Sequence, residues 1–110
     1  MPYAFVKLNI DGKDFIGTDY GVGPVDAALN AIQKITGQIS ELRIKDYGLA
    51  SISGGSTALC EVTVRVEDAQ GNNVSAKSIG EDIVTTSVQA VIDAINRIML
   101  KKMLNQKQLS

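Results

Sequence analysis

The hydrophobic pattern of this chain changes its period at two glycine-marked junctions, and this feature constrains the fold more than any other. Apolar and polar residues alternate over 4–10 and again over 60–67. After Gly21, and again after Gly80, apolar residues recur every three or four positions instead. Alternation is typical of a half-buried strand, and the longer period is typical of an amphipathic helix. The pattern therefore predicts strands followed by a helix, twice over.

The first half of the chain is predicted to form a hairpin and a helix. Residues 4–10 and 13–20 are the two strands, and Asp11-Gly12 between them is a favoured two-residue turn. The helix is predicted to begin at Pro24, because proline suits the first helical position, and to stop at Gly37. The apolar stripe of this helix consists of Val25, Ala28, Leu29, Ile32 and Ile35.

The second half is predicted to form three strands and a second helix. The first of these strands starts near Leu42, with an irregularity near Gly48, and a glycine-rich loop follows. Residues 60–67 are the second strand, in which Cys60 is in phase with three valines and is expected to be an inert core thiol. A turn at 68–73 leads into a third strand over 74–79.

The second helix is predicted to start with Asp82 as its N-cap and to fray after about Lys102. The two halves resemble each other at an offset of 59, which pairs Gly12 with Gly71 and Gly21 with Gly80. The predicted fold is therefore an α+β two-layer sandwich of two related strand-strand-helix units, with both helices on one sheet face. We expect one domain over 1–110, with a core at about 4–100 and a tail at 101–110. Such a layer leaves sheet edges and one face uncovered, so a homodimer is expected.

Composition excludes several classes of function. The 110 residues include 11 Lys+Arg and 12 Asp+Glu, a net charge of −1, which argues against nucleic-acid binding. The chain has no His and one Cys, so it cannot form a Ser-His-Asp triad, a His-ligated zinc site or a CxxC redox site. We therefore expect no catalytic residue, no metal ligand and no cofactor in this domain. Carboxylate chemistry is a poor alternative, because spacing places no acid pair on one concave surface.

The chain also carries no predicted targeting or membrane segment. Its first residues lack a basic stretch followed by an apolar run, and no stretch approaches 18 uncharged apolar residues. With a single Cys, no intramolecular disulfide can form. A cytoplasmic protein without a membrane partner is the expectation.

Several spaced motifs resemble those of one enzyme family. They are Gly21-Val22-Gly23-Pro24-Val25-Asp26-Ala27, Asp46-Tyr47, Gly54-Gly55-Ser56-Thr57-Ala58, Glu61-Val62 and Asp82-Ile83-Val84-Thr85-Thr86-Ser87. Together they resemble the C-terminal regulatory (allosteric dimer) domain shared by 2-isopropylmalate synthase and citramalate synthase, from about Ala4 to Arg97. The resemblance implies a dimeric domain that binds leucine, or isoleucine in some citramalate synthases, for feedback inhibition. The metal-dependent catalytic barrel of that family has no counterpart in this chain, so the chain alone is expected not to be an enzyme.

Two departures from the family keep an alternative open. Thr57 stands where the family often has Asp, and Thr86 stands beside Ser87 where the family often has Ala. Both departures put the identity of the effector in doubt. A purely structural dimerisation module that binds no metabolite is therefore the competing hypothesis.

An amino-acid effector needs donors for its carboxylate, acceptors for its ammonium group and a small apolar pocket. The two glycine-flanked helix starts offer backbone N–H groups, and Asp26 and Asp82 offer carboxylates, although acids at these positions also serve as caps. The Ser53–Ala58 loop either contacts the ligand or is only a turn, and the role of Tyr47 is implied by the resemblance. The predicted effector-binding residues are Gly23, Pro24, Asp26, Tyr47, Ser56, Thr57, Ala58, Asp82, Ile83 and Thr86.

Overall fold

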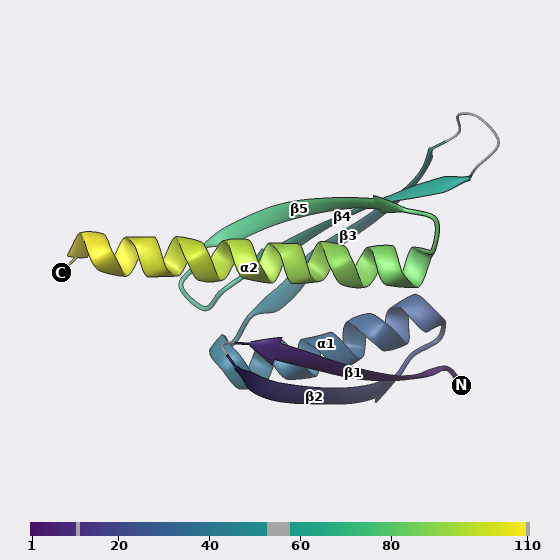
Figure 1. Ribbon diagram of the computed structural model, residues 1–110, viewed down its shortest axis with the longest axis horizontal. Helices are drawn as coiled ribbons and strands as arrows, with labels where there is room; N and C mark the ends of the chain where they lie inside the picture. Colours follow the sequence, from purple (N-terminus) through teal and green to yellow (C-terminus); the bar gives the residue numbers. More distant parts are fainter. Residues whose placement is uncertain (11, 53–57, 110) are drawn as a thin grey trace. The chain divides into compact units, whose positions relative to one another are not determined.

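The computed structural model describes residues 1–10, 12–52 and 58–109, and it has the predicted α+β class and order of elements (Figure 1). The elements are β1 (Tyr3–Ile10), β2 (Lys13–Tyr20), α1 (Pro24–Ser40), β3 (Arg43–Ile52), β4 (Leu59–Glu67), β5 (Asn73–Gly80) and α2 (Ile83–Leu109). The chain divides into two compact units, Met1–Arg43 and Ile44–Ser110. Each unit has its own sheet with a helix packed on it, where the sequence suggested one shared sheet.

The first unit is an antiparallel hairpin covered by α1. The register of β1 and β2 runs from Tyr3 opposite Tyr20 to Ile10 opposite Lys13. As the alternation predicted, Ala4, Val6 and Leu8 of β1 are half-buried, and the odd-numbered side chains of this strand are exposed. Gly17 in β2 is buried, and a Cβ atom there would overlap the carbonyl oxygen of Ala31 in α1. This glycine therefore allows the helix to approach the strand closely.

The end of α1 differs from the prediction. The helix continues through Gly37 to Ser40, and Glu41 then adopts the left-handed conformation with φ 54°. Downstream packing explains the extra turn, because Leu42 is buried. Its carbonyl oxygen accepts hydrogen bonds from Gln33 Nε2 at 2.6 Å and Thr36 Oγ1 at 3.2 Å. These bonds tie the last turns of the helix to the residue that follows it.

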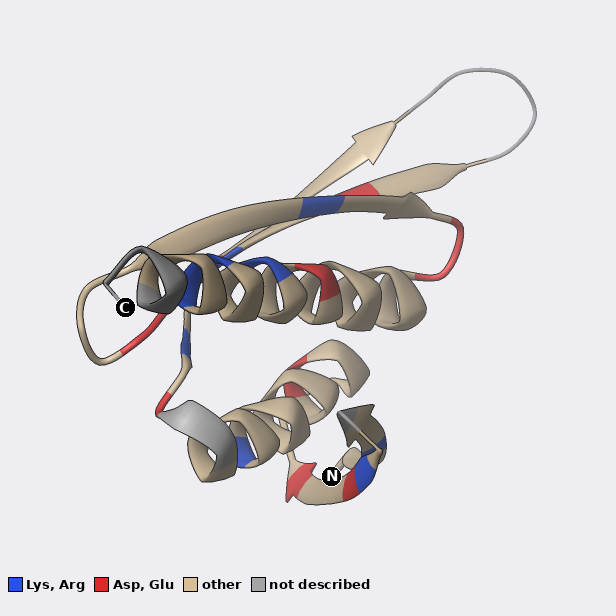
Figure 2. Cartoon of the chain, turned by 60° about the vertical axis from the view of Figure 1, so that its left-hand side comes forward, with Lys and Arg blue, Asp and Glu red and all other residues tan. Residues whose placement is uncertain are grey.

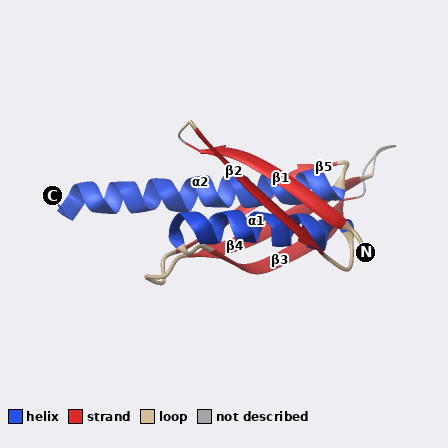
Figure 3. Cartoon of the chain, turned by 90° about the horizontal axis from the view of Figure 1, so that it is seen from below, coloured by secondary structure: helices blue, strands red, loops and turns tan. Residues whose placement is uncertain are grey.

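The second unit is a three-stranded sheet, ordered β3-β4-β5, with α2 packed on β4 and β5 (Figure 3). The register of β4 and β5 runs from Cys60 opposite Gly80 to Glu67 opposite Asn73. The three alternate valines of β4 are buried, as predicted. Cys60 is only half-buried, and its Sγ donates to the carbonyl oxygen of Gly80 at 3.3 Å. The expected irregularity near Gly48 does not interrupt β3.

The second helix is longer than predicted, because α2 continues past Lys102 to Leu109. Lys102 itself helps to hold this segment, since its Nζ lies 3.8 Å from Oδ2 of the buried Asp68. Within the 23 residues Ile83–Asn105, an 18-residue window has a mean hydropathy of 1.3, so by length and composition alone this segment could cross a membrane. Their buried residues pack on the sheet, as in the core helix of a soluble protein, so this criterion is weak evidence for a span.

The structure shows the internal repeat in its burial pattern. Six buried positions of α1 correspond, at an offset of 59, to six of the buried positions of α2. They are Ala27, Ala28, Ala31, Ile32, Ile35 and Thr36 in α1, and Thr86, Ser87, Ala90, Val91, Ala94 and Ile95 in α2. The paired turn glycines, Gly12 and Gly71, share positive φ angles of 82° and 87°. The two units are therefore related hairpin-helix structures, and β3 is the additional strand of the second.

Candidate functional site

The N-terminus of α1 is the first candidate for ligand binding. Gly23 is its N-cap, with extended φ −147° and ψ 172°, and no described side chain caps this end of the helix. Pro24 occupies the first turn and has no N–H group, while the N–H of Ala27 donates to the carbonyl oxygen of Gly23 at 2.9 Å. N–H groups of the first turn and the positive end of the helix dipole are therefore available to an anion.

Asp26 has a structural role at the same junction. Its Oδ2 accepts a hydrogen bond from the N–H of Val22 at 3.0 Å, which ties the third helical residue to the segment before the helix. Gly21 is buried against this turn, because a Cβ atom there would overlap the backbone nitrogen of Ala27 and lie 2.7 Å from Asp26 Oδ2. The capping role that the sequence allowed for Asp26 is thus present, in a form that resembles a capping box.

The N-terminus of α2 is capped by the side chain of Asp82. Asp82 Oδ2 accepts from the N–H of Thr85 at 2.8 Å, and the carbonyl oxygen of Asp82 accepts from Thr86 at 2.9 Å, which confirms the predicted N-cap. A hydrogen bond from the Thr85 side chain, and then those from the N–H groups of Thr85 and Val84, hold the pKa of Asp82 below its ordinary value. The two helix starts therefore differ, because only that of α1 lacks a side-chain cap.

A short hydroxyl chain links β3 to the start of α2. Tyr47 Oη lies 2.8 Å from Ser87 Oγ, and Ser87 Oγ donates to the carbonyl oxygen of Ile83 at 2.6 Å. A serine hydroxyl has one proton, so the Tyr47 hydroxyl is the donor to Ser87. Ser87 is fully buried, whereas Tyr47 is 36% and Ile83 is 37% exposed. These hydrogen bonds hold the Tyr47 hydroxyl at the first turns of α2, and the side chains of Tyr47 and Ile83 both remain partly in contact with solvent.

Thr86 and Ser87 are both polar residues on the buried stripe of α2. Thr86 packs at the end of β5, where a Cβ atom on Gly80 would overlap its Oγ1. Ser87 was not among the predicted site residues. The signal for it was a serine in phase with the apolar stripe, since a polar side chain at such a position must find a hydrogen-bond partner.

The predicted site residues fall into two groups. Gly23, Pro24 and Asp26 lie at the start of α1 in the first unit, and Tyr47, Asp82, Ile83 and Thr86 lie at or beside the start of α2 in the second. Ala58 is exposed and directly precedes β4. Ser56 and Thr57 lie outside the described residues. Within the described ranges, no group of three or more His, Cys, Asp or Glu residues is placed to hold a metal ion.

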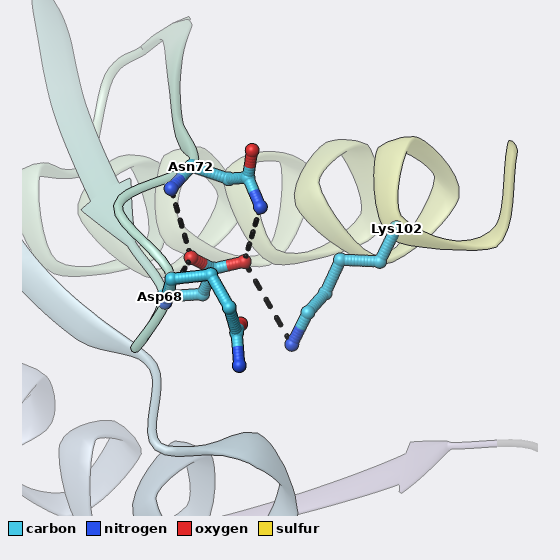
Figure 4. Close-up of polar contacts among 4 residues, drawn as sticks. Asp68, Asn72 and Lys102 are labelled. Carbon is cyan, nitrogen blue, oxygen red and sulfur yellow. Dashed lines mark hydrogen bonds and ion pairs between the residues drawn. The ribbon is translucent and has the colours of Figure 1, made fainter. Parts of the chain in front are cut away.

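The turn between β4 and β5 is organised by a buried carboxylate that sequence reasoning treated only as part of a loop (Figure 4). Asp68 Oδ1 accepts from the N–H groups of Gln70 at 3.0 Å and Asn72 at 2.9 Å. Asp68 Oδ2 accepts from Asn72 Nδ2 at 3.0 Å and faces Lys102 Nζ at 3.8 Å. Burial raises the pKa of Asp68, but these hydrogen bonds and the lysine outweigh it, so its pKa lies below the ordinary value of 3.8.

We expect this carboxylate to make stability depend on pH. Because the folded pKa of Asp68 is lowered, its contribution is complete well above pH 3.8 and is lost as the pH falls through the folded pKa. Asp68→Asn should lower the melting temperature at neutral pH and flatten its decline between about pH 5 and pH 2.5. Thermal melts at several pH values check this, with Asp14→Asn, on an exposed ion pair, as the control. If the melting temperature of Asp68→Asn falls with pH as steeply as that of the wild type, Asp68 is not the source of this pH dependence.

Comparison with known proteins gives one consistent family. The model of the LeuA allosteric (dimerisation) domain matches residues 1–99. The 2-isopropylmalate synthase of Methanocaldococcus jannaschii is 44% identical over 102 residues, which are 93% of this chain and 19% of that protein. The probable 2-isopropylmalate synthase of Methanosarcina mazei is 42% identical over 101 residues, or 92% of this chain and 20% of that protein.

A second enzyme of the same group is also similar. The (R)-citramalate synthase CimA of Methanocaldococcus jannaschii is 39% identical over 100 residues, which cover 89% of this chain and 20% of that protein. The chain therefore spans about a fifth of the length of the curated relatives that it matches.

Proposed function

Because this chain belongs to the LeuA allosteric (dimerisation) domain family, we propose that it is the leucine-binding regulatory domain of a 2-isopropylmalate synthase. The match over residues 1–99 is the observation that carries the proposal. In this role a homodimer of the domain binds leucine and inhibits a catalytic barrel elsewhere in the parent enzyme. The process is feedback control of branched-chain amino-acid biosynthesis in the cytoplasm, and the domain itself needs no cofactor.

The uncapped start of α1 supports recognition of the effector's carboxylate. An anion at this position accepts hydrogen bonds from first-turn N–H groups and interacts favourably with the helix dipole. Gly23 leaves room for it, because open space surrounds the position that its Cβ atom would take. In contrast, the carboxylate of Asp82 already occupies the corresponding position at the start of α2. We therefore assign the carboxylate of leucine to the first unit.

Residues of the second unit supply chemistry of a different kind. The partly exposed Tyr47 ring and Ile83 side chain offer apolar surface, and the hydroxyl chain through Ser87 holds the tyrosine in place. We propose this surface as a separate candidate site within the second unit, able to contact an apolar side chain. Asp26 is exposed and lies at the same helix start as the proposed carboxylate site, so we propose it as the acceptor for the ammonium group.

An isoleucine-binding domain of a citramalate synthase is the second candidate. Its support is the similarity to the citramalate synthase of Methanocaldococcus jannaschii, at 39% identity against 44% for the 2-isopropylmalate synthase of the same organism. The chemistry at the start of α1 is the same for both effectors, since they share the carboxylate and the ammonium group. A dimerisation module without an effector is the remaining alternative.

Replacing Gly23 with aspartate is expected to weaken leucine binding while the domain stays folded. The new carboxylate would stand where the effector's carboxylate binds, and like charges should weaken binding by at least about tenfold. Folding should be retained, because the φ of Gly23 is negative and aspartate is a favoured N-cap residue. Calorimetric titration with leucine measures the loss, and a thermal melt verifies the fold.

Gly37→Asp is the matched control, since it adds the same charge to α1 at a position with open space around it. It should leave leucine affinity unchanged. If Gly23→Asp binds leucine as the wild type does, the carboxylate does not lie at the start of α1, although the domain as a whole can still bind leucine elsewhere.

A further inference from the structure

The two units differ in how many neighbours their central hairpin strand has. In the first, Ala4, Val6 and Leu8 of β1 lie opposite Asp19, Gly17 and Phe15 of β2. In the second, Val62, Val64 and Val66 of β4 lie opposite Ser78, Ala76 and Val74 of β5. β1 is thus the counterpart of β4. However, β4 lies between β3 and β5, whereas β1 pairs only with β2 among the described strands.

The outer edge of β1 presents a regular set of backbone groups. The N–H of Gly21 donates to the carbonyl oxygen of Pro2 at 3.1 Å, so Pro2 and Gly21 form a hydrogen-bonded pair. Hydrogen-bonded and non-bonded pairs alternate along an antiparallel ladder. The even-numbered residues of β1 therefore bond to β2, and the N–H and C=O groups of Tyr3, Phe5, Lys7 and Asn9 point to the outer edge.

The same hairpin has an exposed apolar face. Its exposed apolar side chains are Tyr3, Phe5, Ile16 and Tyr20, which are 55%, 61%, 52% and 56% exposed. The corresponding face of the second unit is instead crossed by the ion pairs Arg65–Asp46 and Lys77–Glu61, whose residue types are coloured in Figure 2. A free strand edge beside an apolar face is a template for pairing with another strand.

We propose that the outer edge of β1 pairs antiparallel with the same edge of a second copy of this chain. The result is a continuous four-stranded sheet, β2-β1-β1-β2, across a twofold axis. This inference rests on the proposed function in one respect, namely that the domain acts as a dimer. It goes further by assigning the strand through which the two copies meet.

Charge complementarity selects the register of this pairing. With Phe5 opposite Lys7 of the second copy and Tyr3 opposite its Asn9, every outward-facing residue of β1 has a partner. The aliphatic stem and ammonium group of the lysine can then lie against the aromatic ring. A register shifted by one residue in each copy would place the two Lys7 side chains directly opposite each other, which is destabilising. The opposite shift would place Asn9 opposite Met1, outside β1, so only the first register gives every outward-facing residue of β1 a partner within β1.

Hydrogen exchange combined with light scattering tests the edge. As concentration rises and the mass changes from 11.7 kDa to twice that value, the amides of Phe5 and Lys7 should gain protection. Those of Val6 and Leu8 should already be protected within the hairpin. A dimer whose Phe5 and Lys7 amides exchange equally fast at all concentrations overturns the proposal but leaves the dimeric module intact. A monomer at every concentration overturns both, whereas protection of these amides already in the monomer overturns the edge pairing alone.

Two variants of the same residue test the register. Phe5→Lys and Phe5→Glu both remove the aromatic ring. In the proposed pairing, the new lysine faces Lys7 of the other copy with a like charge, whereas the new glutamate faces it with an opposite charge. Because each effect occurs twice across the twofold axis, the dissociation constant of Phe5→Lys should exceed that of Phe5→Glu by at least about tenfold. Ile16→Thr, on the same face but on β2, should dimerise like the wild type. Equal dissociation constants for the two Phe5 variants would overturn the pairing of Phe5 with Lys7.

Discussion

Gly17→Ala is expected to lower the melting temperature of this protein by about 12 °C. The added methyl group would overlap the carbonyl oxygen of Ala31 and lie 2.8 Å from Ile35 Cγ1, and both belong to the buried side of α1. A backbone carbonyl cannot rotate away from the methyl group, so the helix must move off the strand. Overpacking of this kind costs about 3 kcal/mol, and at this chain length each kcal/mol corresponds to roughly 4 °C.

Gly37→Ala is the matched control for this substitution. Gly37 lies inside α1, its φ is not positive, and open space surrounds the position of its Cβ atom. The same methyl group should therefore stabilise the protein by about 0.5–1 kcal/mol, because alanine loses less conformational entropy than glycine in a helix. Calorimetric melts of the two variants make the comparison. A Gly17→Ala variant that melts with the wild type would show that α1 does not approach β2 so closely.

Leucine is expected to raise the melting temperature by about 10 °C when its concentration is a hundred times its dissociation constant. Binding to the folded state alone adds about 2.7 kcal/mol under these conditions, and at this size each kcal/mol again corresponds to roughly 4 °C. The shift should grow with the logarithm of leucine concentration. Thermal denaturation over a series of leucine concentrations measures it, and the Gly23→Asp variant should show at most about half of the wild-type shift.

Parallel titrations with isoleucine, valine and glycine separate the proposed functions. A larger shift with isoleucine than with leucine favours the citramalate synthase domain over the 2-isopropylmalate synthase domain. Glycine shares the carboxylate and ammonium group but has no side chain, so it serves as the control for non-specific effects. If millimolar leucine and isoleucine both leave the melting temperature unchanged, the amino-acid sensor is excluded and the purely structural dimerisation module takes its place.

Local signals in the sequence were sufficient for the start of each helix. Pro24 marks the first turn of α1 because its fixed φ angle and missing N–H are tolerated only there. Asp82 marks the start of α2 because its short side chain reaches the N–H groups of the first turn. Each signal involves residues within one helical turn, so no tertiary information is needed to interpret it.

The ends of the helices depend on contacts that periodicity does not contain. α1 passes through Gly37 because Gln33 and Thr36 bond to the carbonyl oxygen of the buried Leu42. In α2, Lys102 meets Asp68, a residue 34 positions earlier in the chain, and composition alone suggested a fraying tail there. Alternation likewise identified the inner faces of β1 and β4, but it does not state which strands share a sheet.

In the candidate site, too, local features were predictable from the sequence and contacts between distant residues were not. Asp82 was expected as a cap from its position alone, whereas the contact between Tyr47 and Ser87 joins residues 40 positions apart and required the folded chain. Ser87 escaped prediction because a serine on an apolar stripe resembles a tolerated small residue until its bonding partners are known. Tyr47 was identified by family resemblance, since an aromatic side chain in a strand is common in any sheet.

The difference in length between the two repeated halves of the chain lies in the turn that Asp68 organises. The equivalent pairs Leu8–Phe15 and Val66–Val74 enclose residues 9–14 in one hairpin and residues 67–73 in the other, so the second loop is one residue longer. An extra residue inside a strand would have turned its apolar side chains toward water. Instead, the Asp68 carboxylate accepts hydrogen bonds from backbone N–H groups of the longer loop. The extra residue therefore leaves the buried positions of the two repeats in phase. Insertions and deletions between the repeats are thus accommodated in the turn, where no strand register has to be preserved.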